Sequence, residues 1–323
     1  MTPPFGVLVM AYGTADGPGD IERYYTDIRG GRPPMPEHLE ELRERYAAIG
    51  DRFPLMEITR RQAEGVEREL NADGGGQSFR AYLGMKHSPP FIPEAVERMR
   101  ADGIQHAVGI VMAPHWSGMS VETYVEQVRD AAADGGPEFA FVRSYHDDPR
   151  FVSFLAGRVA HALGRLMPAE REDAAVIFSA HSLPVRTLQD GSLRCTRCSS
   201  CEDACRYRDG LQETADLVAE ELGLKHHTIA WQSAGRTADP WWGPPIEAVI
   251  VELAEAGRPA VVVCSAGFVA DHLEILYDLD IEAKAIAEEA GIAFARTRMP
   301  NADRAFLDVL ARVVREHLAD AGA

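Results

Sequence analysis

The stretch AAVIFSAHSLP at residues 174–184, together with AVVVCSAGFVADHLE at residues 260–274, decides the fold. Each stretch begins with a short apolar run and then turns polar. An apolar run of roughly four to eight residues, rich in β-branched side chains, is typical of a buried strand. In open parallel sheets, ligands bind just outside the carboxyl ends of the strands. We therefore expect His181 and Glu274 to face one cleft, because each follows one of the two runs.

The same alternation of apolar runs with amphipathic stretches continues along the chain. Strands separated by helical patterns of roughly ten or more residues indicate βαβ units with parallel sheets. We expect an α/β fold of two doubly wound halves, Rossmann-like or flavodoxin-like, each with a four-stranded parallel sheet flanked by helices. Polar residues and Pro149 interrupt the pattern and divide the chain into residues 1–146 and 147–323. The expected strands are residues 6–11, 79–83, 107–112, 139–144, 174–178, 225–230, 260–264 and 292–295.

Composition limits the classes of function. The chain has 323 residues, 46% of them apolar, which is enough for two hydrophobic cores. It carries 50 acidic and 33 basic side chains, a net charge of -17, so we expect no nucleic-acid partner. No apolar stretch approaches the roughly 20 residues that span a bilayer, and the N-terminus lacks a signal-peptide pattern. We expect a cytoplasmic protein without membrane insertion.

Four motifs make the chain similar to a known enzyme family. They are MAYGT at residues 10–14, FSAHSLP at 178–184, WQSAGRTADPWWGP at 231–244 and GFVADHLEILYD at 267–278. With them the chain resembles the ferrochelatases, which insert ferrous iron into a porphyrin, and the resemblance runs nearly from end to end. Tyr12 and the run IERYYTDIR at 21–29 make it most similar to the soluble bacterial branch that acts on coproporphyrin III. The resemblance also implies that the last helix, around 301–317, packs on the first half.

Iron insertion requires a base for two pyrrole protons and ligands for the arriving cation. A neutral imidazole binds first-row metals and accepts protons near neutral pH. In the family, the His of the HSLP motif and the Glu of the DHLE motif form the central metal-contacting pair, and these match His181 and Glu274. The alternative for His181 is a hydrogen-bonded histidine that ends a strand. His87 also follows an expected strand and is a candidate for the metal route or the pocket.

A series of acidic residues extends from this pair. Its members are spaced by three, four and four residues, so a helix would place their carboxylates along one face: Asp271, Glu274, Asp278 and Glu282. Such a stripe could lead ferrous ions inward. The alternative is a solvated helix face.

A porphyrin with several carboxylates needs an apolar slot and basic groups at its rim, and arginine pairs bidentately with carboxylate. The resemblance implies that Tyr12 reaches the metal of the bound product axially. Arg29 and Arg45 could instead be surface charges, and the tyrosines could be core residues. At Phe53 the chain departs from related sequences, which often carry a small hydroxyl residue there. The residues that match porphyrin-contacting positions of the family are Tyr12, Arg29, Arg45, Tyr46 and Tyr124.

Four cysteines lie within a short segment that looks inserted relative to cysteine-free members of the family: Cys195, Cys198, Cys201 and Cys205. Their C-x2-C-x2-C-x3-C spacing is typical of a metal site, because a reducing cytoplasm disfavours disulfides. Some ferrochelatases carry a [2Fe-2S] cluster, so the resemblance favours that group, with a structural or sensing role. Structural zinc is a second interpretation, and disulfides or free thiols are a third. Cys264 lies within an expected strand and is most simply a core residue.

The sequence therefore predicts an enzyme that inserts Fe²⁺ into coproporphyrin III and makes transient contact with neighbouring enzymes of haem synthesis. A second hypothesis is a cobalt or nickel chelatase acting on another tetrapyrrole. A third is a haem or iron–sulfur carrier without turnover, for which the acidic stripe would have no purpose.

Overall fold

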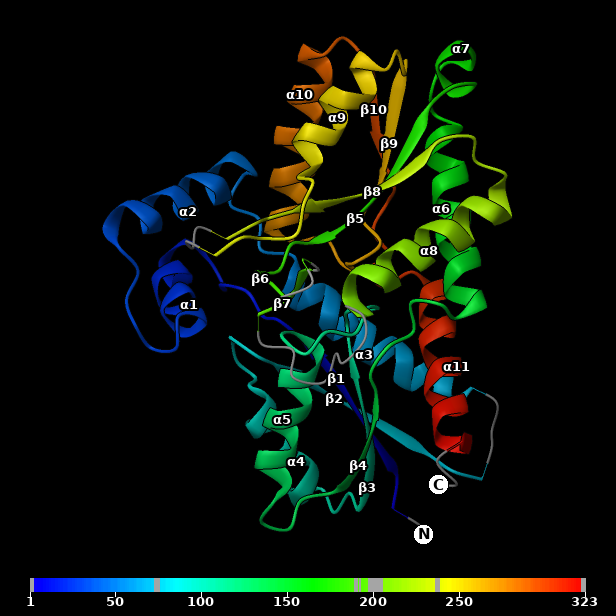
Figure 1. The fold of residues 1–323 in the computed structure, drawn as a ribbon. Coiled ribbons are helices and arrows are strands. Elements are labelled where there is room, and N and C mark those ends of the chain that lie inside the picture. Colours follow the sequence, from blue (N-terminus) through cyan, green and yellow to red (C-terminus); the bar gives the residue numbers. More distant parts are fainter. Residues whose placement is uncertain are drawn as a thin grey trace.

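The computed structural model describes residues 3–72, 76–188, 191, 193–196, 206–235 and 239–320. Two parallel four-stranded sheets lie one above the other in Figure 1. The first has the order β2-β1-β3-β4, and the second has the order β10-β9-β5-β8. The expected α/β class and all eight expected strands are confirmed. Their bounds are β1 Phe5–Ala11, β2 Phe79–Met85, β3 His106–Val111, β4 Glu138–Val142, β5 Ala175–His181, β8 His227–Gln232, β9 Ala260–Cys264 and β10 Ala293–Arg296.

One strand end differs from the expectation in a way that concerns the site. We predicted that the strand would end at Phe178, but β5 continues to His181. Ser179 and Ala180 are fully buried, and they pair with Ala230 and Trp231 of β8. Small side chains therefore let the strand run on between its neighbours. As a result, His181 is held by the sheet itself.

The helices cover both faces of each sheet (Figure 1). Alternate residues of β1 show the arrangement, because Val7 and Val9 pack with α3 and α11, whereas Leu8 and Met10 pack with α4 and α5. The helix bounds are α1 Ile21–Ile28, α2 Pro36–Ala48, α3 Leu55–Asn71, α4 Ile92–Ala101, α5 Val121–Ala132, α6 Pro149–Leu163, α7 Pro168–Arg171, α8 Arg206–Leu222, α9 Ile246–Glu255, α10 Lys284–Glu289 and α11 Arg304–Asp320, with the short turn η1 Pro18–Asp20 and the π-helix η2 Ile275–Ala283.

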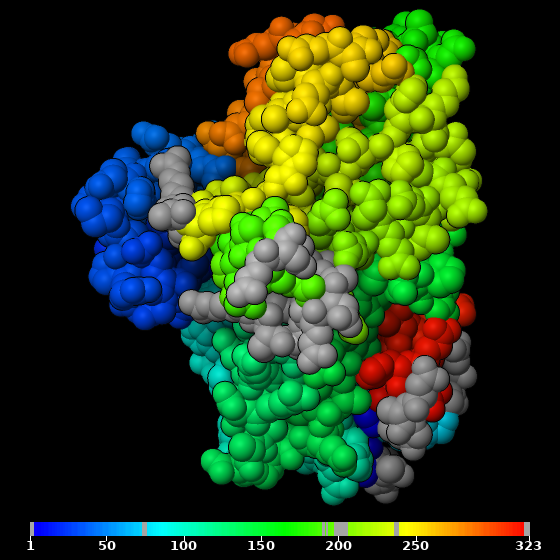
Figure 2. Space-filling view, in the orientation of Figure 1, coloured from blue at the N-terminus to red at the C-terminus, as the bar shows by residue number. Residues whose placement is uncertain are grey.

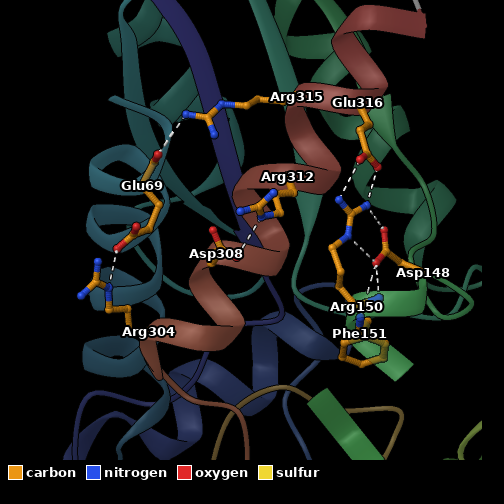
Figure 3. A network of polar contacts seen from close by, with 9 residues as sticks. All are labelled: Glu69, Asp148, Arg150, Phe151, Arg304, Asp308, Arg312, Arg315 and Glu316. Atoms are coloured by element: carbon orange, nitrogen blue, oxygen red, sulfur yellow. Dashed lines mark hydrogen bonds and ion pairs between the residues drawn. The ribbon is translucent and has the colours of Figure 1, made fainter. Parts of the chain in front are cut away.

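Helix α11 returns to the first sheet and is fastened at both sides (Figure 3). Arg315 donates to the backbone oxygens of Glu69 and Leu70 in α3 at 3.1 and 2.8 Å. On the other side, the Glu316 carboxylate accepts from Arg150 of α6 at 2.7 Å. The division of the chain between residues 146 and 147 stays a prediction.

Two small features frame the region of interest. Strands β6 Val185–Thr187 and β7 Leu193–Cys195 form an antiparallel hairpin after β5 that the sequence did not indicate. Helices α1 and α2 form a lobe at the side of the molecule, next to the segment after β8, as the blue and yellow surfaces in Figure 2 show. Within the described part of the chain, no helix is both long and apolar enough to cross a bilayer.

Candidate active site

The polar residues of interest follow strands of both sheets. Tyr12 comes directly after β1, and His87 comes two residues after β2. Because Ala11 and Met85 are partners in the parallel register, the two segments leave the sheet together, and the His87 amide donates to the Tyr12 carbonyl at 2.9 Å. His181 ends β5 in the second sheet.

Glu274 lies between two imidazoles. Its Oε1 is 3.6 Å from Nε2 of His181, and its Oε2 is 3.6 Å from Nε2 of His272. The Nδ1 atoms of both rings contact backbone carbonyls, His181 that of Ser182 and His272 that of Ala270. Each ring thus donates through Nδ1 and presents Nε2 to the carboxylate. The structure places His181 and Glu274 next to each other, as the sequence predicts.

The charges of this group are coupled. Burial alone lowers the pKa of His181, but the Glu274 carboxylate outweighs it and raises that pKa to about 8. The pKa of His272 is raised in the same way, against the effect of burial. Burial alone would raise the pKa of Glu274, yet the two imidazoles lower it well below its usual range. At neutral pH the site therefore holds an ionised Glu274 and a mostly protonated His181. His181 loses this proton as the pH rises through about 8.

Asp278 is the buried member of the acidic series. Its side chain is 3% exposed and accepts hydrogen bonds from Arg45 and Ser233. Burial, followed by repulsion from Glu274, raises the pKa of Asp278 to about 7, although Arg45 opposes the shift. Glu282 is 43% exposed and lies 3.8 Å from Arg45. The series thus runs from the interior to solvent, with Asp278 able to exchange a proton near neutral pH.

A π-helix carries these carboxylates. Glu274 immediately precedes η2, which contains both Asp278 and Glu282. The wider i→i+5 turn of a π-helix is rare in proteins, and where it occurs it is often at a functional site. Asp271, which we grouped with the stripe because of its spacing, lies outside it and pairs with Arg296 at 3.3 Å and Asn301 at 2.7 Å.

The opposite wall comes from the first sheet. Tyr12 is 43% exposed, and its ring centroid lies 4.6 Å from that of His87. His87 Nδ1 is 2.7 Å from Oδ1 of Asp27. The Lys86 ammonium donates to Thr123 at 2.7 Å and lies 6.0 Å from the centre of the Tyr12 ring. A cation and an imidazole therefore lie beside the exposed tyrosine, and a carboxylate pairs with that imidazole.

The other residues predicted to contact the porphyrin differ in burial. The Arg29 guanidinium lies 6.0 Å from the Tyr25 ring, at the end of α1. Tyr46 is 3% exposed and stacks on Phe53 at 4.4 Å, so the phenylalanine extends the apolar packing there. Tyr124 is also 3% exposed. Their roles toward a porphyrin stay predictions.

Several site residues were missed from the sequence. His272 lies two residues before Glu274 within the same motif, and that proximity was the available signal. Lys86 likewise precedes His87. Ser233 and Asp27 gave no signal, because their partners are distant in sequence. Trp231 lies one residue beyond the expected strand 225–230, but it belongs to β8 and is 1% exposed.

Only part of the cysteine group can be placed. Cys195 ends β7, is 1% exposed, and its Sγ accepts from Trp242 Nε1 at 3.4 Å. Cys198, Cys201 and Cys205 lie outside the described residues. Among the side chains that the structure does describe, no three His, Cys, Asp or Glu residues form a preformed metal site. Cys264 is a core residue of β9, as expected.

Comparison with known proteins gives a consistent result. The family model described as Ferrochelatase matches residues 4–318. A "Coproporphyrin III ferrochelatase" from Anoxybacillus flavithermus is 46% identical over 98% of this chain and 97% of its own. One from Bacillus subtilis is 44% identical over 97% of each. The solved structure "SirB from Bacillus subtilis with Fe3+" covers 99% of this chain and 97% of its own, with a TM-score of 0.59. At 12% identity it shows the fold alone.

Proposed function

Because the chain belongs to the ferrochelatase family, we propose that it inserts ferrous iron into coproporphyrin III and so makes iron coproporphyrin for haem synthesis. The observation that carries the proposal is the approach of His181 and Glu274 to 3.6 Å from different strand ends. Relatives of similar length, 44–46% identical and named for this reaction, support the choice of porphyrin.

In this mechanism His181 and Glu274 bind the metal and accept the pyrrole protons. An approaching Fe²⁺ favours loss of the imidazole proton, because the cation and imidazolium repel each other. The freed Nε2 and the Glu274 oxygens then face the metal. As iron leaves the pair and enters the ring, two pyrrole protons are released. The freed carboxylate–imidazole pair takes the first, passes it to solvent, and then takes the second in the same way. His272 holds Glu274 from its other side and keeps the carboxylate ionised.

We also propose that Asp278 and Glu282 form the cation route. Glu282 is exposed, Asp278 is buried, and Glu274 lies beyond them beside His181. At an effective dielectric near 20, unit charges about 8 Å apart interact by roughly 2 kcal/mol, which biases the position of an ion without trapping it. His87, held by Asp27, serves the same route from the opposite wall.

The porphyrin would lie between the two walls. Tyr12 is exposed at the strand end and is proposed to reach the metal of the product axially. Arg29 and Arg45 would meet ring carboxylates, with Tyr46 and Tyr124 packing behind them. Arg45 already pairs with Asp278, so a ring carboxylate would share that cation and couple porphyrin binding to the metal route.

We propose that Cys195, Cys198, Cys201 and Cys205 bind a [2Fe-2S] cluster. The support is their spacing, together with the buried Cys195 sulfur that accepts an indole N–H, as cluster thiolates do. The cluster would supply structural or redox-sensing chemistry, since inserting ferrous iron transfers no electrons. Structural zinc is the alternative, and an absorbance spectrum of anaerobically purified protein separates the two, because zinc thiolates do not absorb visible light.

The test of the function is an anaerobic assay with Fe²⁺ and either coproporphyrin III or protoporphyrin IX. We expect many turnovers per enzyme, with coproporphyrin III preferred and His181→Ala strongly impaired. Cobalt or nickel with another tetrapyrrole as the better substrates would favour the second chelatase hypothesis. Product limited to one equivalent would indicate a carrier. A cytoplasmic location and transient contacts with neighbouring haem-pathway enzymes stay predictions, to be tested by cell fractionation and crosslinking.

A further inference from the structure

The first turn of α8 is hydrogen-bonded to the end of β5. Tyr207 lies in the first turn of α8, two residues after Cys205. Its hydroxyl donates to the backbone oxygen of His181 at 2.8 Å, and its side chain is buried. The first helical turn after the cysteines therefore contacts the backbone of the proposed metal ligand.

Trp242 contacts the neighbouring residue Ser182 and also Cys195. Trp242 donates its indole N–H to Cys195 Sγ at 3.4 Å. Its backbone oxygen accepts from the Ser182 hydroxyl at 2.8 Å, and its backbone N–H donates to Leu183 at 3.1 Å. Trp242 therefore connects Cys195 to Ser182, the residue that follows His181.

Both connections rest on a rigid support. The Tyr207 and Trp231 rings are 5.4 Å apart, and Trp231 stacks on Trp242 at 6.0 Å. Trp231 is fully packed within β8, where it pairs with Ala180 of β5. A displacement of Tyr207 or Trp242 would therefore press on Trp231 and, through it, on the strand that carries His181.

The orientation of the His181 ring depends on these bonds. Its Nδ1 contacts the backbone oxygen of Ser182, and this contact directs Nε2 toward Glu274. The Tyr207 hydroxyl donates to the His181 carbonyl, and the Ser182 hydroxyl donates to the Trp242 carbonyl. The peptide between His181 and Ser182 is therefore fixed from both sides.

We propose that Tyr207 is a positioning residue for His181, and that Trp242, through Ser182, fixes the same peptide from the other side. The inference rests on the proposed function, since it assumes that His181 binds the metal. The two contacts would then influence iron insertion through the position of one side chain.

The direct test is Tyr207→Phe, which removes the hydroxyl and keeps the ring against Trp231. We expect kcat/KM for Fe²⁺ to fall about tenfold, because small displacements of a reacting group are costly. The Kd for coproporphyrin III, measured by fluorescence quenching, should stay unchanged. In NMR spectra of the metal-free protein, the His181 ring signals should shift. Tyr145→Phe is the matched control, because it also removes a buried hydroxyl that donates to a backbone oxygen, that of Val111 at 3.4 Å.

A second pair of variants tests the arm through Trp242. Ser182→Ala should reproduce the kinetic and NMR signature of Tyr207→Phe, and the double variant should lose less than the product of the two single losses, because both act on one peptide. Wild-type kcat/KM for Fe²⁺ together with unshifted His181 signals in Tyr207→Phe would overturn the inference. A wild-type protein without chelatase activity would instead overturn the proposed function, and the NMR comparison would still report on the position of His181.

Discussion

Arg45 and Asp278 form an ion pair that joins helix α2 to the π-helix, although 233 positions separate them in the sequence. The Asp278 carboxylate is almost completely buried, whereas the Arg45 side chain is 27% exposed. The pair therefore connects a basic residue of the α1–α2 lobe to the proposed metal route.

Replacing Arg45 with leucine should raise the pKa of Asp278, which burial and Glu274 already raise to about 7 and which Arg45 partly restrains. A larger fraction of Asp278 would then be protonated at pH 7, and KM for Fe²⁺ should rise several-fold. The exposed Arg43→Leu on the same helix is the control, since its contacts at 3.5 and 3.7 Å involve exposed glutamates. Equal kinetics for the two variants would remove Asp278 from the metal route.

The rate of iron insertion should depend on the protonation of His181. Its pKa is raised to about 8, so the imidazole is mostly protonated at pH 7 and becomes a free base as the pH rises. We expect kcat/KM for Fe²⁺ to increase with pH up to about that value. Glu274→Gln removes the charge that raises this pKa, so burial should dominate and the NMR titration midpoint of His181 should fall. A midpoint that does not move would contradict the coupling.

Removing the proposed catalytic base, His181, should lower the turnover number. His181→Ala should lower kcat on the order of 10²–10⁴-fold. His115→Ala is an unsuitable comparison because that residue is buried, so His106→Ala, on the exposed N-terminal end of β3, serves as the control. Turnover that survives in His181→Ala would place the base elsewhere.

Acid should destabilise the fold partly through His115. This residue is 2% exposed, and burial followed by the nearby His146 lowers its pKa to about 3. The unfolded chain takes up this proton near pH 6.5 and the folded protein does not, so stability falls as the pH drops below 6.5. From pH 6.5 to 5 the loss is about 2 kcal/mol. Urea unfolding of His115→Gln should show a correspondingly smaller pH dependence, whereas His106→Gln should match the wild type.

The N-cap of α6 and the ion pair that links α6 to α11 should differ in strength. The Asp148 carboxylate accepts from the backbone N–H of Arg150 at 2.8 Å and caps α6 (Figure 3). Asp148→Ala should lower the free energy of unfolding by about 1–2 kcal/mol. Glu316 is 59% exposed, so Glu316→Ala should cost about 0.5 kcal/mol or less. Urea denaturation that reverses this order would show that α11 depends on its ion pair more than α6 depends on its cap.

The cysteine segment offers a test by absorbance and melting. With a bound [2Fe-2S] cluster, the protein should be coloured, and Cys198→Ser should bleach it and lower both the melting temperature and the activity. Full activity with unchanged melting in Cys198→Ser would reject a structural role for the cluster.

Much of the arrangement could be predicted because its causes are local. Apolar runs indicate strands, and the strand-end rule brought His181 and Glu274 to one place. The rest depends on long-range packing. The extension of β5 to His181 follows from partners in β8, and the i→i+5 turn that holds Asp278 has no signature in residue spacing. The Arg45–Asp278 pair required the lobe to fold onto the π-helix, which no local pattern indicates.

The return of α11 to α3 has a consequence for biosynthesis. Val66 and Leu70 of α3 are buried in one hydrophobic cluster with Leu307 and Leu310 of α11. At Gly65 the two helices lie so close that any Cβ would collide with Leu307. A nascent chain therefore exposes this apolar face until the ribosome has released residues 304–320. Translation arrest before that point would yield a product with an exposed hydrophobic surface, which chaperones and proteases recognise.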